Sequence, residues 1–142
     1  AACEVVLGDA RLSLEREPPR GFDVLALDAF SGDSVPVHLL TRQAFRLYFR
    51  HLKPDGVLAV HITNRYLDLA PVVRAAGEAT GREVRVLRPD GDPAQGTLPC
   101  EWAVAARAGF FDGPQWRGTP TPPRLEEPWT DDYSNLLRVV RR

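Results

Sequence analysis

Two carboxylates, Asp28 and Asp33, carry the clearest chemical potential in this chain, in the stretch LDAFSGDSVP. The apolar run Val24–Leu27 comes directly before them and predicts a strand buried on both faces of a parallel sheet. Ligands of open α/β sheets bind beyond the carboxyl ends of the strands, where a carboxylate can attract a cation and accept a proton. The alternative is a solvated turn, because Asp is common beside Gly and Ser.

A third acid, Asp9, follows the run EVVL at residues 4–7, which predicts another strand. The residues after it, 10–16, carry Leu12 and Leu14 among charged residues and predict a short helix. Asp9 therefore either caps this helix through its carboxylate or belongs to a binding site at the strand end.

The elements that must position these acids alternate between strand and helix. We predict a helix from Arg42 to Leu52 with an apolar stripe and a buried strand over 57–62. A second helix is predicted over 69–80, with an inner stripe of Val72, Val73, Ala76 and Ala79. The runs 83–87 and 102–106 predict two more strands that form an antiparallel pair around a loop rich in Gly and Pro. This order indicates a mainly parallel α/β sheet with an antiparallel edge hairpin.

Composition restricts the class of protein. The 142 residues form one domain by our interpretation, 1–142, with a surface loop at 109–128 that holds five prolines (114, 120, 122, 123 and 128). A formal net charge of -1 argues against nucleic acid as a partner. Apolar runs are far shorter than the roughly 20 residues of a membrane span, and two isolated cysteines fit reduced thiols in the cytoplasm.

Other polar candidates are weaker. The histidines His38, His51 and His61 share no ligand spacing, so we expect no metal site, and single histidines of this kind usually make structural hydrogen bonds. His61, Asn64 and Tyr66 follow the predicted strand over 57–62, where they could line the same crevice as Asp28.

Three stretches together resemble the spermidine synthase (aminopropyltransferase) family, which belongs to the Rossmann-like enzymes that use S-adenosylmethionine or its decarboxylated form. They are GDAR after a strand, FDVLALDAFSGDSVP, and LLTRQAFRLYFRHLKPDGVLAVHI. The closing WTDDYSNLL resembles bacterial spermidine synthase-like proteins, some of which are fused to membrane-spanning segments. The similarity covers only what would be the second half of the family's catalytic domain.

The resemblance implies roles for particular residues. Asp9, with Ala10 beside it, would bind the adenine amino group of decarboxylated S-adenosylmethionine, and Asp28 would accept the proton of the attacking amine. Asp33 would hold a cationic polyamine substrate such as putrescine, and Tyr66 is our further candidate for contact with it. Two departures stand out: DAFSGDSVP is longer between its acids than the family's DSSDP, and residues 90–101 contain no Tyr.

The family's strand order, 3-2-1-4-5-7-6, has further consequences. This chain would supply strand three and strands four to seven, without the first two strands and their glycine-rich turn. One edge of the strand at 22–27 would then stay open. The chain has no Met, so we interpret it as a piece of a longer protein. The open edge allows two further interpretations: it pairs with a second copy to form a homodimer, or EVVL moves to cover it.

The predicted activity is aminopropyl transfer in polyamine biosynthesis by the parent protein, with the isolated chain inactive. The alternatives are S-adenosylmethionine-dependent methyl transfer and a degenerate domain without catalysis, such as the cytosolic appendage of a membrane protein.

Overall fold

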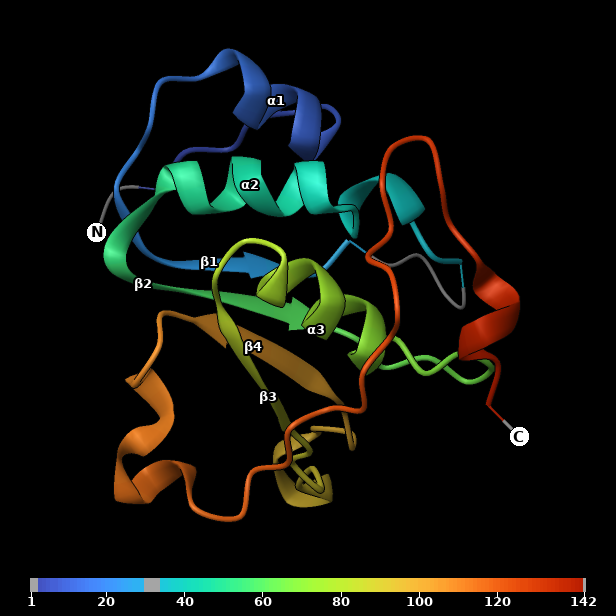
Figure 1. Cartoon of the computed structure of the whole chain (residues 1–142). Helices are drawn as coiled ribbons and strands as arrows, with labels where there is room; N and C mark the ends of the chain where they lie inside the picture. The colour runs from blue at the N-terminus through green and yellow to red at the C-terminus, as the bar shows by residue number, and fades with distance from the viewer. Residues whose placement is uncertain (1–2, 30–33, 142) are drawn as a thin grey trace.

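A four-stranded sheet with helices on one face organises the chain (Figure 1). The computed structural model describes residues 3–29 and 34–141. In chain order the elements are α1 (Ala10–Arg16), β1 (Phe22–Leu27), α2 (Arg42–His51), β2 (Leu52–His61), α3 (Ala70–Glu78), β3 (Glu83–Leu87) and β4 (Trp102–Ala106). Short 3₁₀ turns interrupt the loops, and one of them, Leu136–Val139, forms the final apolar run.

The sheet has the strand order β1-β2-β4-β3. β1 and β2 are parallel, whereas β4 is antiparallel to both β2 and β3, so three strands run one way and β4 runs the other. The order matches the 4-5-7-6 part of the order expected from the sequence. The predicted α/β class and the antiparallel hairpin of β3 and β4 are confirmed.

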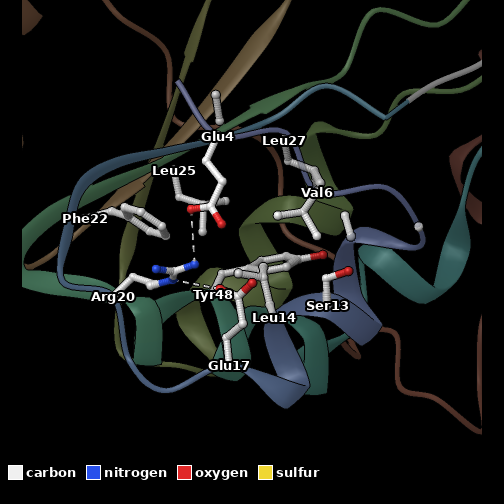
Figure 2. A pocket seen from close by; sticks show the side chains of 13 residues that line it. Glu4, Val6, Ser13, Leu14, Glu17, Arg20, Phe22, Leu25, Leu27 and Tyr48 are labelled. Carbon is white, nitrogen blue, oxygen red and sulfur yellow. Dashed lines mark hydrogen bonds and ion pairs between the residues drawn. The ribbon is translucent and has the colours of Figure 1, made fainter. Parts of the chain in front are cut away.

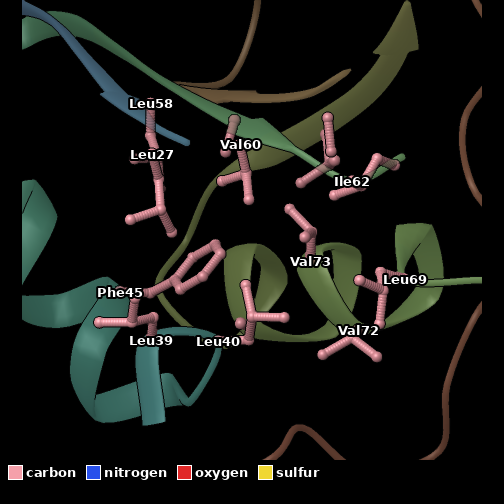
Figure 3. Close-up of a cluster of buried hydrophobic side chains, with 14 of the residues drawn as sticks. Leu27, Leu39, Leu40, Phe45, Leu58, Val60, Ile62, Leu69, Val72 and Val73 are labelled. Carbon is pink, nitrogen blue, oxygen red and sulfur yellow. The ribbon is translucent and has the colours of Figure 1, made fainter. Parts of the chain in front are cut away.

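The core lies between the sheet and the helices α2 and α3, which cover the same face (Figure 3). Phe45 and Tyr48 of α2 and Val72 and Val73 of α3 are fully buried against Leu58 and Val60 of β2. Burial of such side chains stabilises the fold by about 1.5–3 kcal/mol each. The predicted apolar stripes of both helices therefore do form the core, except that Ala79, placed in the stripe of α3, lies just after the helix and is exposed.

Strand β1 is not buried on both faces, which corrects the sequence prediction. Leu27 is buried and Leu25 half-buried, but Val24 is 62% exposed and Phe22 39% exposed. The reason is that helices cover only one face of β1 among the described residues, while its other face and its outer edge meet solvent. As predicted, no strand pairs with the outer edge of β1 within residues 3–29 and 34–141.

The run EVVL does not form the predicted strand. Residues 3–7 have no regular secondary structure, and Val5, Val6 and Leu7 are exposed by 78%, 54% and 92%. A strand needs a partner for its backbone hydrogen bonds, and within the described part of the chain no strand pairs with these residues. A β-branched run alone therefore does not form a strand here, because no neighbouring strand pairs with it in the described part of the chain.

The turn from α2 into β2 is tighter than the sequence suggests. The helix ends at His51 and β2 begins at once, with an irregularity in register between Phe22 and Val24 of the neighbouring strand. A Cβ at Gly56 would lie 2.8 Å from the carbonyl oxygen of Phe22, so glycine allows this close approach.

Within the described ranges, no helix is long and apolar enough to cross a membrane.

Gly77 gives a test of how closely α3 packs on the sheet. A Cβ there would lie 2.6 Å from Cγ2 of Val84, so Gly77→Ala overpacks this contact at a cost of about 1–3 kcal/mol. Alanine gains about 1 kcal/mol in helix propensity. We expect a net loss of up to about 2 kcal/mol in the free energy of unfolding, measured by urea denaturation.

The matched background for this prediction is Val84→Ala, which removes the opposing methyl groups. In that background Gly77→Ala should raise stability instead of lowering it. If Gly77→Ala changed the free energy of unfolding in the same direction in both backgrounds, close packing between α3 and β3 would be contradicted.

Candidate functional site

Asp28 lies at the carboxyl end of β1, where it meets a residue from the end of β2. Its Oδ1 atom is 2.8 Å from Nδ1 of His61, and its side chain remains 61% exposed. The register explains the contact, because Leu27 pairs with Val60 and the next residue of each strand therefore falls side by side. The result is a carboxylate that one imidazole orients and that solvent, or a ligand, can reach.

His61 is itself held on several sides. Its ring stacks on Trp102 with centroids 4.9 Å apart, and its Nε2 atom is 2.7 Å from the hydroxyl of Thr63. The Thr63 oxygen accepts the Glu101 backbone N–H at 2.7 Å, so its own hydrogen is available for Nε2. By this pattern Nδ1 carries the ring proton and donates a hydrogen bond to Oδ1 of Asp28.

Asp9 caps α1 and also meets a histidine. Oδ1 accepts the backbone N–H of Leu12 at 2.9 Å, and Oδ2 lies 3.1 Å from Nε2 of His38. The Leu12 hydrogen bond, and to a smaller extent His38, hold the pKa of Asp9 below its usual value. The capping alternative from the sequence is thus confirmed, and a role in ligand binding stays a prediction.

A polar network beside this cap joins three distant segments. The guanidinium of Arg11 donates to both carboxylate oxygens of Asp131, at 2.8 and 2.7 Å, and to the carbonyl of His38 at 2.7 Å. Asp131 also accepts the hydroxyl of Thr41 at 2.7 Å, and Thr41 caps α2 through the N–H of Ala44. No local sequence pattern reveals this pairing, because 120 residues separate Arg11 from Asp131.

The other histidine, His51, has a structural role. It is fully buried, and Nε2 donates to the carbonyl of Leu14 at 2.9 Å, next to Arg50, which contacts the same carbonyl at 3.1 Å. Together they satisfy carbonyl groups at the end of α1.

Tyr66, the further candidate, lies in a loop whose backbone is fixed. The Asn64 side chain accepts the N–H groups of Tyr66 and Leu67, both at 2.9 Å, and the Tyr66 carbonyl accepts the Arg141 N–H at 2.8 Å. The Tyr66 side chain is exposed, and the guanidinium of Arg65 lies 5.9 Å from its ring centroid. One face of the ring therefore already meets a cation.

A cavity of about 510 Å³ opens along the free side of β1, between this strand, α1 and the N-terminal segment (Figure 2). Leu14, Leu25 and Leu27 form apolar walls, and Tyr48 also lines the cavity, with its hydroxyl donating to the Leu39 carbonyl at 3.0 Å. At the rim Arg20 pairs with Glu17 at 2.8 Å and reaches Glu4 at 3.7 Å. Ala10 lines this cavity, but Asp9 and Asp28 do not.

The predicted site residues therefore fall into separate groups. Asp28 is brought to His61, Asp9 to His38, and Tyr66 to the loop that Asn64 and Arg141 hold, whereas Asp33 lies outside the described residues. In the part of the chain that the structure describes, no group of three or more His, Cys, Asp or Glu side chains could hold a metal ion. Sequence reasoning placed His61 near the crevice but missed its pairing with Asp28.

Comparison with known proteins supports the fold. No protein-family model and no curated protein matches the chain. Among solved structures, a probable spermidine synthase from Corynebacterium glutamicum ATCC 13032 is similar, with a TM-score of 0.54 and 24% identity over 72% of this chain and 37% of that one. MnmC2 from Aquifex aeolicus gives a TM-score of 0.52 and 23% identity over 87% of this chain and 33% of that one.

The chain thus spans about a third of the length of each of these proteins. At such identities the likeness shows the fold alone. It is an α/β fold with part of a Rossmann-like sheet of the methyltransferase type, in agreement with the class predicted from the sequence.

The Arg11 network predicts a specific dependence of stability on pH. Hydrogen bonds from Arg11, above all, lower the pKa of Asp131, and Thr41 adds to this effect. The stabilisation is therefore complete above the unfolded-state pKa of about 3.9 and is lost as the pH falls through the lower, folded-state pKa. Asp131→Asn should cost about 1 kcal/mol at pH 7, since solvent reaches the partly exposed Asp131 and weakens the ion pair, and the difference should shrink below about pH 4.

Urea denaturation at a series of pH values measures this difference, and Asp132→Asn is the matched control, expected to stay within about 0.5 kcal/mol of the unchanged chain. A pH-independent gap between Asp131→Asn and the unchanged chain would refute an ionic contribution.

Proposed function

We propose that this chain forms the acceptor side of a transferase domain that moves an aminopropyl group from decarboxylated S-adenosylmethionine to an amine such as putrescine. The observation that carries the proposal is the pair of Asp28 and His61 at the carboxyl ends of two parallel strands. The fold it shares with a probable spermidine synthase supports the same assignment. Two unpaired cysteines suit the reducing cytoplasm, where we place the reaction.

Asp28 has the properties that an amine acceptor site needs. An amine is cationic at neutral pH and becomes nucleophilic only after it loses a proton, so a carboxylate can first attract it and then take that proton. The hydrogen bond from His61 Nδ1 fixes one oxygen of Asp28 and leaves the other side of the carboxylate for the amine. The nitrogen lone pair then forms the new C–N bond.

The bond that breaks lies in the cosubstrate. Decarboxylated S-adenosylmethionine would supply a carbon bound to a sulfonium sulfur. When the amine attacks this carbon, the sulfur leaves as a thioether and keeps the electron pair of the broken C–S bond. Asp9 fits the adenine amino group in chemical terms, because a carboxylate accepts about four hydrogen bonds and Leu12 and His38 use only part of this capacity. By the same proposal Ala10 lies beside the nucleoside, and Asp33 and Tyr66 contact the polyamine.

Methyl transfer from S-adenosylmethionine to an amine is a second candidate. Two observations favour it: residues 90–101 contain no Tyr to contact a diamine, and the likeness to MnmC2 covers more of this chain than the likeness to the spermidine synthase. A domain without catalysis is the third candidate, and failure of the parent protein to bind any adenosyl ligand would favour it.

Binding of putrescine to the chain tests the acceptor role of Asp28. We expect Asp28→Asn to weaken binding at least about tenfold, because a hydrogen bond to a charged group contributes about 1.5–3 kcal/mol. Isothermal titration calorimetry at pH 7 measures the dissociation constants.

The matched control is Asp23→Asn, which removes a carboxylate of the same strand that pairs with Lys53 at 2.7 Å, at the strand's opposite end. It should bind putrescine like the unchanged chain. Equal losses in both variants, or none in Asp28→Asn, would exclude Asp28 as the amine site. Product analysis of the parent protein with each of the two cosubstrates then separates aminopropyl from methyl transfer.

A further inference from the structure

Another cavity, of about 330 Å³, lies at the same end of β2 as the Asp28–His61 pair, and Thr63, which contacts His61, is part of its lining. Its walls come from the residues after β2, from the loop between β3 and β4 and from the C-terminal tail. Four charged residues line it: Arg88, Asp90, Glu101 and Arg141. The positive and negative charges are balanced, so the cavity suits neither a simple anion nor a simple cation.

Glu101 fixes the two arginines in the cavity wall. Its Oε1 accepts Nε of Arg88 at 2.7 Å, and its Oε2 accepts Nη2 of Arg141 at 2.6 Å. Burial raises the pKa of Glu101, but the hydrogen bonds from the two arginines outweigh burial and lower it, so the carboxylate stays charged. Because Glu101 is only 19% exposed, a ligand in the cavity meets the guanidinium groups of Arg88 and Arg141 rather than the Glu101 carboxylate.

The arginines keep donors for a ligand. A guanidinium has five N–H groups, and the contacts of Arg88 and Arg141 with Glu101 and with the Leu67 carbonyl use only some of them. Arg88 and Arg141 are 53% and 40% exposed, so solvent reaches both. Such groups favour a carboxylate, which a guanidinium can bind through two parallel hydrogen bonds.

Thr63 connects this cavity to the amine site. It lines the cavity, and its hydroxyl lies 2.7 Å from Nε2 of His61, whose Nδ1 is 2.8 Å from Asp28. Neither His61 nor Asp28 lines the cavity, so Thr63 and the His61 ring lie between the cavity and the amine site, and a ligand that occupies both must pass along these two side chains.

We propose that this cavity binds the zwitterionic head group of an α-amino acid, with its carboxylate at Arg88 and Arg141 and its ammonium at Asp90. The inference rests on the proposed function and narrows it: the acceptor is a diamino acid whose side-chain amine reaches Asp28, rather than a plain diamine. The two arginines and two acids of the lining match the paired charges of this head group.

L-Ornithine and putrescine form a matched pair of probes, because ornithine is putrescine with one added carboxylate. We expect the unchanged chain to bind ornithine about tenfold more tightly than putrescine, because one further charge is hydrogen-bonded. Arg88→Gln should bring the ratio of the two dissociation constants close to one, measured by isothermal titration calorimetry. Arg107→Gln is the control, since Arg107 pairs with Asp55 at the opposite end of the sheet.

Cys100 gives a second readout, because it lines the cavity as an unpaired thiol. In a Cys3→Ser background, ornithine should slow the reaction of Cys100 with iodoacetamide, and putrescine should slow it less. A ratio near one in the unchanged chain, or a ratio that Arg88→Gln leaves unaltered, overturns the inference, as does lack of any ornithine binding.

Failure of the proposed function has a different signature. If Asp28→Asn weakens neither ligand while ornithine keeps its preference and Arg88→Gln removes it, the head-group cavity stands and Asp28 is not the amine site. If Asp28→Asn weakens both ligands equally and the ratio stays near one, the amine site stands and the head-group cavity falls.

Discussion

The parallel pairing of β1 with β2 is the constraint on which the candidate site depends. Because Leu27 lies opposite Val60, the chain leaves both strands at the same level, and the first polar residue of each exit meets the other. Asp28 and His61 are therefore neighbours although 33 positions separate them. A shift of one residue in register would turn one of these side chains to the opposite face and separate the pair.

This geometry also explains what the sequence could and could not predict. The apolar runs at β1 and β2 located the strands and therefore Asp28, and the polar residues after β2 suggested that His61 lines the same crevice. The pairing itself depends on register, which apolar runs buried on a parallel sheet do not specify. Likewise the tight entry into β2 at Gly56 depends on a contact with Phe22, a residue of another strand.

The two errors about strands have one physical origin. The sequence patterns of EVVL and of β1 describe side chains that suit a sheet, but a strand also needs a partner at its edge and cover on its faces. In the described part of the chain, β1 has a partner on one edge and helices on one face, and EVVL has neither. The residue types of β1 correctly predicted a strand because β2 supplies the backbone hydrogen bonds. The residue types of EVVL predicted a strand wrongly because no neighbour supplies such bonds.

Trp129 imposes an order on the assembly of the domain. Its side chain is fully buried in the core, and its carbonyl accepts the backbone N–H of Arg42 at the start of α2. The helix and the sheet it covers are thus completed by a residue that a ribosome makes almost 90 positions after Arg42. During synthesis the apolar face of α2 therefore lacks its final cover until the tail emerges, and exposed apolar surface of this kind favours association between nascent chains.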